Sequence, residues 1–340
     1  MKKIICVLLV AVLIAGLAFA KGGSEAASTA KKPTYTITFN EPFTRPHTLA
    51  EAAYMFKSIV EEKSNGDIQV DVYEGGVLGT SQDALEAVQV GTQTMVDAAT
   101  APTVAFDAAF GVLNLPYLFS SREQWYSILD GELGQALLDR LEAQGFVGLG
   151  FAENGIRHVT NNVRPIYKWE DLNGIKIRLM QNQVFISTFE LFGCLTTTTP
   201  WAEVYSALQQ KVVDGQENPV SNIVNAKLYE VQKYMSLTGH TYDPNIYFVN
   251  KAFWDTLPAN YQQILRDAAK EAIAWQRKAA QEAEQSLIEE CAKYMEVNEV
   301  SPEEIARFRD QAAPVYDMQR DVIGADILDA WVEAVNNYGK

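Results

Sequence analysis

A basic side chain within an apolar strand pattern is the first feature that could do chemistry. Residues 175–179 (IKIRL) alternate apolar positions with Lys176 and Arg178, so both basic side chains leave one face of the predicted strand. A mid-strand arginine would be costly in a helix-covered sheet. We therefore expect Arg178 at the strand's carboxyl end, where ligands of open α/β sheets bind and a guanidinium can hold a carboxylate through two hydrogen bonds. The alternative is a strand-end arginine paired with a surface acid, and Arg157 has the same two interpretations.

Two segments downstream combine polar and aromatic residues at a predicted helix start. In 199–203 (TPWAE), Thr199 is the expected N-cap and Pro200 the first turn, while Trp201 either fixes the helix to the core or forms a flat apolar wall for a ligand. In 214–219 (DGQENP), Asn218 is either an N-cap or an amide presented to a ligand at a helix N-terminus. Both segments favour binding chemistry without requiring it.

Catalytic and metal-binding patterns are not found in the sequence. The three histidines, His47, His158 and His240, lack zinc-site spacing, and there is no CxxC, GxSxG, P-loop or dinucleotide-binding motif. Carboxylates are numerous enough for an acid pair, but no motif brings two together. We therefore expect a protein that is not an enzyme, with no cofactor and no metal. An exported hydrolase is the alternative that this expectation disfavours.

The elements that must position these residues alternate between strand and helix. Strand patterns cover 35–40, 68–73 and 95–100, with helices at 49–60 and 81–90 between them. This order predicts a mainly parallel, helix-covered sheet. Further helical patterns fall within 122–143, and strands are expected at 146–152, 157–160 and 175–179. The fold class predicted is therefore α/β with two lobes, the second starting near Asn154.

One helical segment is longer than a single small lobe. From 259 to 297 there is neither Gly nor Pro, and apolar residues recur close to the helical period. At 1.5 Å per residue such a helix extends roughly 50 Å or more. It is either a packing or coiled-coil element or, as we prefer, a strut that crosses both lobes.

The N-terminus predicts export. Lys2 and Lys3 precede an apolar run that ends in Ala18-Phe19-Ala20, the order of a secretory signal peptide cleaved after Ala20. Residues 21–32 form a polar tether, and an uncleaved membrane anchor is the alternative. The formal net charge of −15 argues against nucleic acid and against direct binding to acidic lipids. Cys194 and Cys291 are expected to be buried free thiols rather than a disulfide.

An ordered set of motifs resembles the solute-binding proteins of the tripartite ATP-independent periplasmic (TRAP) transporters, in particular the dicarboxylate-type branch. The segments run collinearly through most of the mature chain. They are GGVLGTSQDALEAVQVGT (75–92), NLPYLF (114–119), ENGIRHVTN (153–161), GIKIRLMQN (174–182), PWAEVYSALQQ (200–210), VDGQENP (213–219) and EVQKYMSLTGH (230–240).

The resemblance implies roles for individual residues. Arg178 matches the arginine that pairs with the ligand carboxylate, Arg157 an arginine that supports it, Trp201 an aromatic wall, Asn218 a hydrogen-bonding amide and Asn40 a polar contact from the other lobe. The expected ligand-binding set is completed by Thr100, His47, Asn182 and Glu217. The resemblance also implies two lobes that close around the ligand by a hinge.

Departures from the family pattern leave the ligand open. Ala99 stands where sialic acid-binding members carry a glutamate, which argues against sialic acid. Four threonines at 196–199 and Lys211 replace more usual residues. Sugar acids such as uronates are favoured by the pattern around 178–182, with C4-dicarboxylates and other small organic acids as alternatives.

The resemblance gives the domain plan and the partners. We expect lobe I to comprise 33–153 and about 243–283, and lobe II to comprise 154–242 and about 284–340. The protein would act in the periplasm, bind a small organic acid and deliver it to the TRAP membrane subunits for secondary-active uptake. A ligand-sensing partner of a membrane receptor is the alternative function on the same fold.

Overall fold

A continuous nine-stranded sheet organises residues 32–340, the part of the chain that the computed structural model describes. The strand order is β2-β1-β3-β8-β4-β7-β5-β6, with β9 paired to β8. Pairs β3–β8, β4–β7 and β4–β8 are antiparallel and the other pairs are parallel. The predicted signal peptide and nearly all of the tether lie outside the described residues. The strands are β1 (Tyr35–Asn40), β2 (Ile68–Tyr73), β3 (Met95–Ala99), β4 (Phe146–Asn161), β5 (Lys176–Leu179), β6 (Leu195–Thr198), β7 (Gly215–Pro219), β8 (Tyr234–Asn250) and β9 (Glu296–Glu299).

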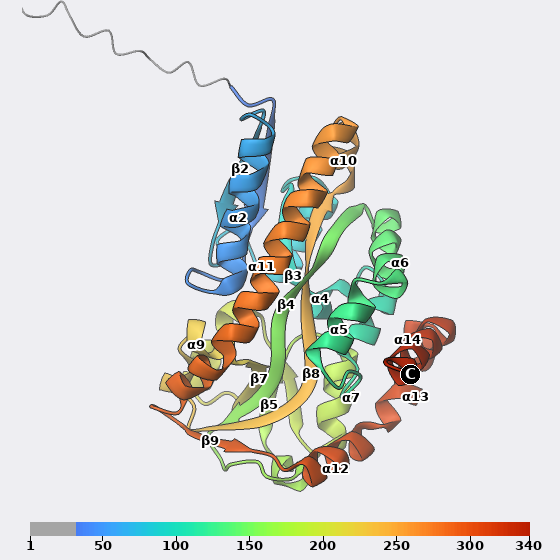
Figure 1. The fold of residues 1–340 in the computed structure, drawn as a ribbon. Coiled ribbons are helices and arrows are strands. Elements are labelled where there is room, and N and C mark those ends of the chain that lie inside the picture. The colour runs from blue at the N-terminus through green and yellow to red at the C-terminus, as the bar shows by residue number, and fades with distance from the viewer. Residues whose placement is uncertain (1–31) are drawn as a thin grey trace, which may run out of the picture. The chain divides into compact units, whose positions relative to one another are not determined.

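Helices cover the sheet, as the sequence predicts for an α/β protein (Figure 1). Between residues 32 and 340, none of them combines the length and apolar character that a membrane span requires. The α-helices are α2 (Thr48–Lys63), α3 (Ser81–Gln89), α4 (Thr100–Thr103), α5 (Arg122–Leu129), α6 (Glu132–Arg140), α7 (Gln183–Leu191), α8 (Val204–Gln209), α9 (Val220–Asn225), α10 (Lys251–Thr256), α11 (Ala259–Cys291), α12 (Pro302–Ala312), α13 (Pro314–Ile323) and α14 (Ala325–Asn337).

Two long antiparallel strands, β4 and β8, run side by side through the centre of the sheet (Figure 1). The sequence predicts two separate strands at 146–152 and 157–160, and this prediction is wrong because β4 continues through the gap. Register shifts near Gly148 and Gly155 accommodate the glycines without ending the strand. At Gly155, φ is +136° and an added Cβ would lie 2.8 Å from Pro219 Cβ, so glycine is required there.

The predicted long helix is α11, which lies beside α2 and extends along the sheet (Figure 1). It ends at Cys291 rather than 297, because Glu296–Glu299 pair with β8 as strand β9. Its first half packs Leu265 and Ala272 into one core cluster, and its last turn packs Cys291 into another. At its middle, Gln276 Oε1 accepts from Glu153 N at 2.9 Å and Nε2 donates to Glu153 O at 2.8 Å, which attaches the helix to β4.

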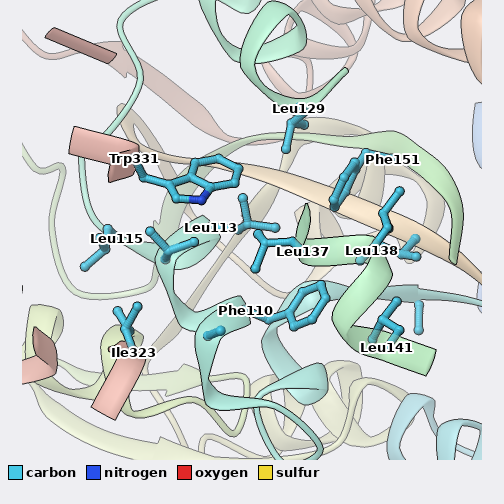
Figure 2. Close-up of a cluster of buried hydrophobic side chains, with 14 of the residues drawn as sticks. Phe110, Leu113, Leu115, Leu129, Leu137, Leu138, Leu141, Phe151, Ile323 and Trp331 are labelled. Carbon is cyan, nitrogen blue, oxygen red and sulfur yellow. The ribbon is translucent and has the colours of Figure 1, made fainter. Parts of the chain in front are cut away.

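The largest apolar cluster lies under α5 and α6 and is joined by the C-terminal helices (Figure 2). Trp331 of α14 and Ile323 of α13 pack into it with Phe110, Leu113 and Leu129. Cys194 and Cys291 are both buried free thiols, which confirms that prediction. The two-lobe division remains a prediction, and this cluster joins the C-terminal helices to residues that we place in lobe I.

The contribution of this cluster to stability can be measured with two tryptophans. Trp331 is 1% exposed and Trp275 on α11 is 41% exposed. We expect Trp331→Ala to lower the free energy of unfolding by about 3–5 kcal/mol, because it leaves a large cavity. The control Trp275→Ala should cost less than ~1 kcal/mol. Urea unfolding followed by circular dichroism measures both, and equal losses would contradict the packing described here.

Candidate functional site

A cavity of about 170 Å³ lies beside the carboxyl ends of β3, β5 and β7 and the adjoining part of β8. Its wall is formed by segments from both ends of the sheet, including the loop after β1 and the first turn of α9. The lining residues are Pro42, Phe43, Thr80, Ser81, Gln82, Ala99, Pro102, Asn154, Arg178, Met180, Gln181, Thr198, Thr199, Pro200, Trp201, Asn218, Asn222 and Asn245. The position agrees with the general rule that ligands of open α/β sheets bind at strand carboxyl ends.

Arg178 lines this cavity at the end of β5, as predicted, and is only 2% exposed. Nε donates to Thr199 O at 2.8 Å and Nη2 donates to the same oxygen, while Nη1 has no hydrogen-bond partner. No carboxylate within residues 32–340 forms an ion pair with this guanidinium. Burial lowers its pKa to about 10, opposed by Glu217 and reinforced by Arg157. Arg178 is thus a buried cation with an unused donor beside an open cavity.

Arg157 has a different environment and does not line the cavity. Its guanidinium is fully buried and binds two acids: Nη2 donates to Glu217 Oε1 at 2.8 Å, Nη1 lies 2.5 Å from Asp243 Oδ2, and Nε also contacts Glu217. Burial alone would lower the pKa of Arg157, but the Glu217 and Asp243 carboxylates outweigh it and raise that pKa. This charge is satisfied inside the protein, so Arg157 is placed to support the wall rather than to attract an anion.

Trp201 forms part of the wall, although its local structure differs from the prediction. A 3₁₀ turn at Trp201–Glu203 precedes α8, and the residue before the turn is Pro200. Thr199 is therefore not an N-cap, and its carbonyl oxygen instead accepts from Arg178. The Trp201 ring packs edge-on to Phe43, with centroids 5.9 Å apart, so two aromatic rings from different segments meet at the cavity.

Asn218 also lines the cavity, but it belongs to strand β7 and not to a helix cap. Its Oδ1 accepts from Asn222 Nδ2 at 3.2 Å, and the same nitrogen donates to Asn154 Oδ1 at 3.1 Å. Asn154 Nδ2 in turn donates to Asp243 at 2.7 Å. Three amides at the wall are thereby held in fixed orientations by one another.

The remaining predicted residues are buried near the cavity without lining it. Thr100 accepts from Asn114, and Asn182 caps α7 through Val184 N. Asn40 Oδ1 is buried without a partner. Glu217 is held by Arg157 and His240, and His47 binds Asn222. The structure thus brings Arg178, Trp201 and Asn218 to the cavity wall, and the other six, which include Arg157, lie behind it.

Several wall residues were not predicted, and only some had a signal in the sequence. Gln82, Asn154 and Met180 lie in the motif segments 75–92, 153–161 and 174–182, so the sequence carries a signal for these three residues. Phe43 and Asn245 come from outside every quoted segment. No local pattern marks them, because only the folded sheet brings their strands to the cavity.

Two buried carboxyl groups, Glu41 and Asp97, face each other next to the wall. Both are fully buried, Asp97 on β3 and Glu41 directly after β1, and Glu41 Oε1 accepts from Phe43 N at 3.0 Å. Burial raises the pKa of Asp97 to about 7, against opposing contacts from Asn245 and Glu41, and neither Asp97 oxygen has a partner of full hydrogen-bond geometry. Burial and Asp97 raise the pKa of Glu41 well above its usual range. Both carboxyl groups therefore keep a proton to higher pH than an ordinary carboxyl group does.

The chain belongs to the bacterial extracellular solute-binding protein family 7, whose model matches residues 39–321. The fold agrees with this family: it is an α/β protein with a long helix, and its cavity has one charged lining residue, Arg178. The predicted family is thereby confirmed. Because the family and its structural neighbours are solute-binding proteins, the expectation that the chain is not an enzyme is also confirmed.

Relatives with defined ligands resemble the chain over most of its length. The 2,3-diketo-L-gulonate-binding periplasmic protein of Escherichia coli is 33% identical over 279 residues, 82% of this chain and 83% of that protein. The C4-dicarboxylate-binding periplasmic protein DctP of Rhodobacter capsulatus is 33% identical over 82% of this chain and 85% of its own length. The sugar acid-binding protein DctPAm of Advenella mimigardefordensis, solved with galactonate, is 33% identical with a TM-score of 0.87 over 90% of this chain and 98% of that one.

The raised pKa values of Glu41 and Asp97 predict a dependence of stability on pH. The ordinary pKa of Asp97 is 3.8 and its pKa in the fold is about 7, so the folded state binds more protons and stability is lost as pH rises from about 4 to 7. We expect Asp97→Asn to remove part of this loss and to raise the Tm at pH 8 by roughly 2–5 °C.

The matched control is Asp321→Asn, because Asp321 is exposed on α13 and should leave the Tm unchanged. Differential scanning calorimetry between pH 4 and 8 measures the wild type and both variants. A lower Tm for Asp97→Asn at pH 8, or an unchanged slope between pH 4 and 7, would show that Asp97 is ionised and well stabilised in the fold.

Proposed function

We propose that this protein captures a small organic acid in the cavity, with the ligand carboxylate bound to Arg178. The observation that carries the proposal is the charge state of this residue: a guanidinium 2% exposed, with an unused Nη1 donor and no acid paired to it in residues 32–340. A buried cation without a counterion is costly, and a carboxylate ligand removes that cost while gaining paired hydrogen bonds. A neutral ligand would leave the charge unbalanced.

The lining favours a sugar acid with one carboxylate. Arg178 is the single charged residue among the lining side chains, so a second carboxylate would have no cation to meet. The amides of Asn154, Asn218, Asn222 and Asn245 offer donors and acceptors suited to hydroxyl groups. Two of the relatives described above bind sugar acids and one binds C4-dicarboxylates, so both classes belong in the test.

Capture would involve closure of two lobes on the ligand. We propose lobe I as 33–153 with about 243–283, and lobe II as 154–242 with about 284–340, joined where β4 and β8 cross between them. The two hydrogen bonds between Gln276 and Glu153 lie at the proposed boundary between the lobes. The loaded protein would deliver its ligand to TRAP membrane subunits from the periplasm.

The ligand class can be tested with pairs of acids that differ at one end. Galactonate and galactarate share a carbon chain, but galactarate carries a second carboxylate, and gluconate and glucarate form another such pair. We expect at least one monocarboxylate to bind roughly tenfold or more tighter than its dicarboxylate by calorimetric titration. Sialic acid should not bind, because Ala99 replaces the required acid. If galactarate or succinate bound more tightly than the monocarboxylates, the proposed ligand class would be a dicarboxylate instead of a sugar acid with one carboxylate.

Replacing Arg178 should lower the affinity for the ligand but raise the stability of the unliganded protein. Arg178→Lys keeps a charge but not the planar pair of donors, and Arg178→Met keeps neither. We expect losses of ~2–5 kcal/mol in binding, or roughly 30- to several-thousand-fold in affinity, with the larger loss for Met. The unliganded Arg178→Met protein should be more stable than wild type, because it no longer buries an unpaired cation.

The control for this experiment is an exposed arginine in an ion pair. The Arg320 side chain is 40% exposed and forms an ion pair with Asp329. Arg320→Met should therefore change neither the binding free energy nor the free energy of unfolding by more than ~1 kcal/mol. Calorimetric titration and thermal unfolding measure all three variants, with circular dichroism to confirm folding. If Arg178→Met lost less than about threefold in affinity, Arg178 would not be the carboxylate-binding group.

A further inference from the structure

A directed chain of hydrogen bonds connects helix α2 to the cavity wall through His47. His47 is the N-cap of α2, and its Nδ1 accepts from Leu49 N at 3.2 Å. An accepting Nδ1 carries no proton, so the ring is neutral and its proton is on Nε2. Nε2 lies 3.1 Å from Asn222 Oδ1 on α9 and therefore donates to it.

The orientation of three wall amides follows from this tautomer. Because Asn222 Oδ1 accepts from His47, its Nδ2 group is left to donate to Asn154 Oδ1 and Asn218 Oδ1. All three asparagines line the cavity, whereas His47 does not. A second proton on His47 would remove the Nδ1 acceptor and leave Leu49 N without its cap. The capping contact that holds the ring in this geometry therefore requires neutral His47.

The same contacts hold the loop after β1 against α9. Phe43 stacks on the His47 ring with centroids 4.2 Å apart and meets Trp201 edge-on, and Asn225 Nδ2 donates to Thr44 O at 2.9 Å. His47 is consequently 5% exposed although it belongs to a loop. Separation of the loop from α9 would break the Asn222 bond and expose the His47 ring to water.

We propose that His47 is a positioning residue that closes the cavity only in its neutral form, so that ligand capture is coupled to release of a proton. The proposal rests on the proposed function, since it assumes that the ligand fills the cavity between the loop and α9. It assigns His47 no contact with the ligand: the residue acts through Asn222, and through it on Asn154 and Asn218.

The charged groups around His47 leave burial as the main cause of its pKa shift. In the closed arrangement burial lowers the pKa of His47 to about 4, with only the Asn222 bond opposing it. α9 carries no titratable residue, and the charged residues on the surrounding segments are Glu41, Arg45, Glu51 and Glu203. Arg45 is paired with Glu74 at 2.8 Å, and Glu41 is bound to Phe43 N. None of these groups contributes to the pKa shift of His47.

The pH dependence then has a defined sign. An exposed His47 in the open protein has an ordinary pKa of about 6.5. Closure therefore releases a proton below that pH, and affinity is complete above it and lost as pH falls toward 4. With these two values, affinity at pH 5 should be roughly 30-fold weaker than at pH 8.

Two substitutions separate the functions of the ring. His47→Asn retains an N-cap acceptor for α2 but is too short to reach Asn222, whereas His47→Gln places an amide N–H near the position of Nε2 and does not titrate. The probes are galactonate, gluconate and succinate, of which the tightest binder to wild type is used. Calorimetric titrations between pH 5 and 8, in buffers of different ionisation enthalpy, give affinity and the number of protons released.

We expect wild type to release a proton below pH 6.5, His47→Asn to bind roughly tenfold or more weakly at pH 8, and His47→Gln to bind within about threefold of wild type with a flat pH profile. Wild-type affinity at pH 8 for His47→Asn, a flat wild-type profile, or a slope that persists in His47→Gln would each overturn the proposal. The last result would assign the proton to Glu41 and Asp97. Absence of binding of any probe to wild type would instead refute the proposed organic acid function.

Discussion

The unpaired positive charge of Arg178 is the constraint on which the rest of the site depends. Its guanidinium is nearly inaccessible to water, two of its nitrogens share one carbonyl oxygen, and the third has no partner. A buried charge of this kind is tolerated only where something compensates it, because desolvation costs several kcal/mol per ion. In the residues described, no acid is paired with Arg178, and we propose that the ligand carboxylate supplies the missing compensation. The proposed function therefore predicts a cavity that selects anions before any finer contact is made.

The distribution of nearby acids explains how this charge stays unpaired. Arg157 lies on the next strand but one and takes up both Glu217 and Asp243, while His240 also holds Glu217. Two further buried acids, Glu41 and Asp97, interact with each other, and both have raised pKa values. Arg157 and Arg178, two of the buried arginines, thus have opposite environments. Arg157 is neutralised internally, and we propose that Arg178 is left for the ligand.

The sheet allows this arrangement because the long strands β4 and β8 lie side by side at its centre. Residues from the loop after β1, from β3 and from β8 reach the cavity from one side, and residues from β5 and β7 reach it from the other. Helix α11 packs into a core cluster on each side and is attached to β4 in between. Polar contacts such as those of His47 with Asn222 and of Asn225 with Thr44 join the loop after β1 to α9.

The amino-acid sequence by itself predicted several of the elements and marked the cationic residue Arg178. Alternation in 175–179 placed Arg178 at a strand end, the helical period predicted α11, and the ordered motifs identified the family. It did not determine that 146–161 is one strand, because glycines mark bulges and breaks alike. Nor did it separate Arg178 from Arg157, since the two have the same local pattern. Only the tertiary structure decided which arginine faces acids and which faces the cavity, and it alone brought Phe43, Asn222 and Asn245 to one wall. The physical reason is that charge compensation and hydrogen bonding act between neighbours in space, which strand pairing over long sequence separations creates.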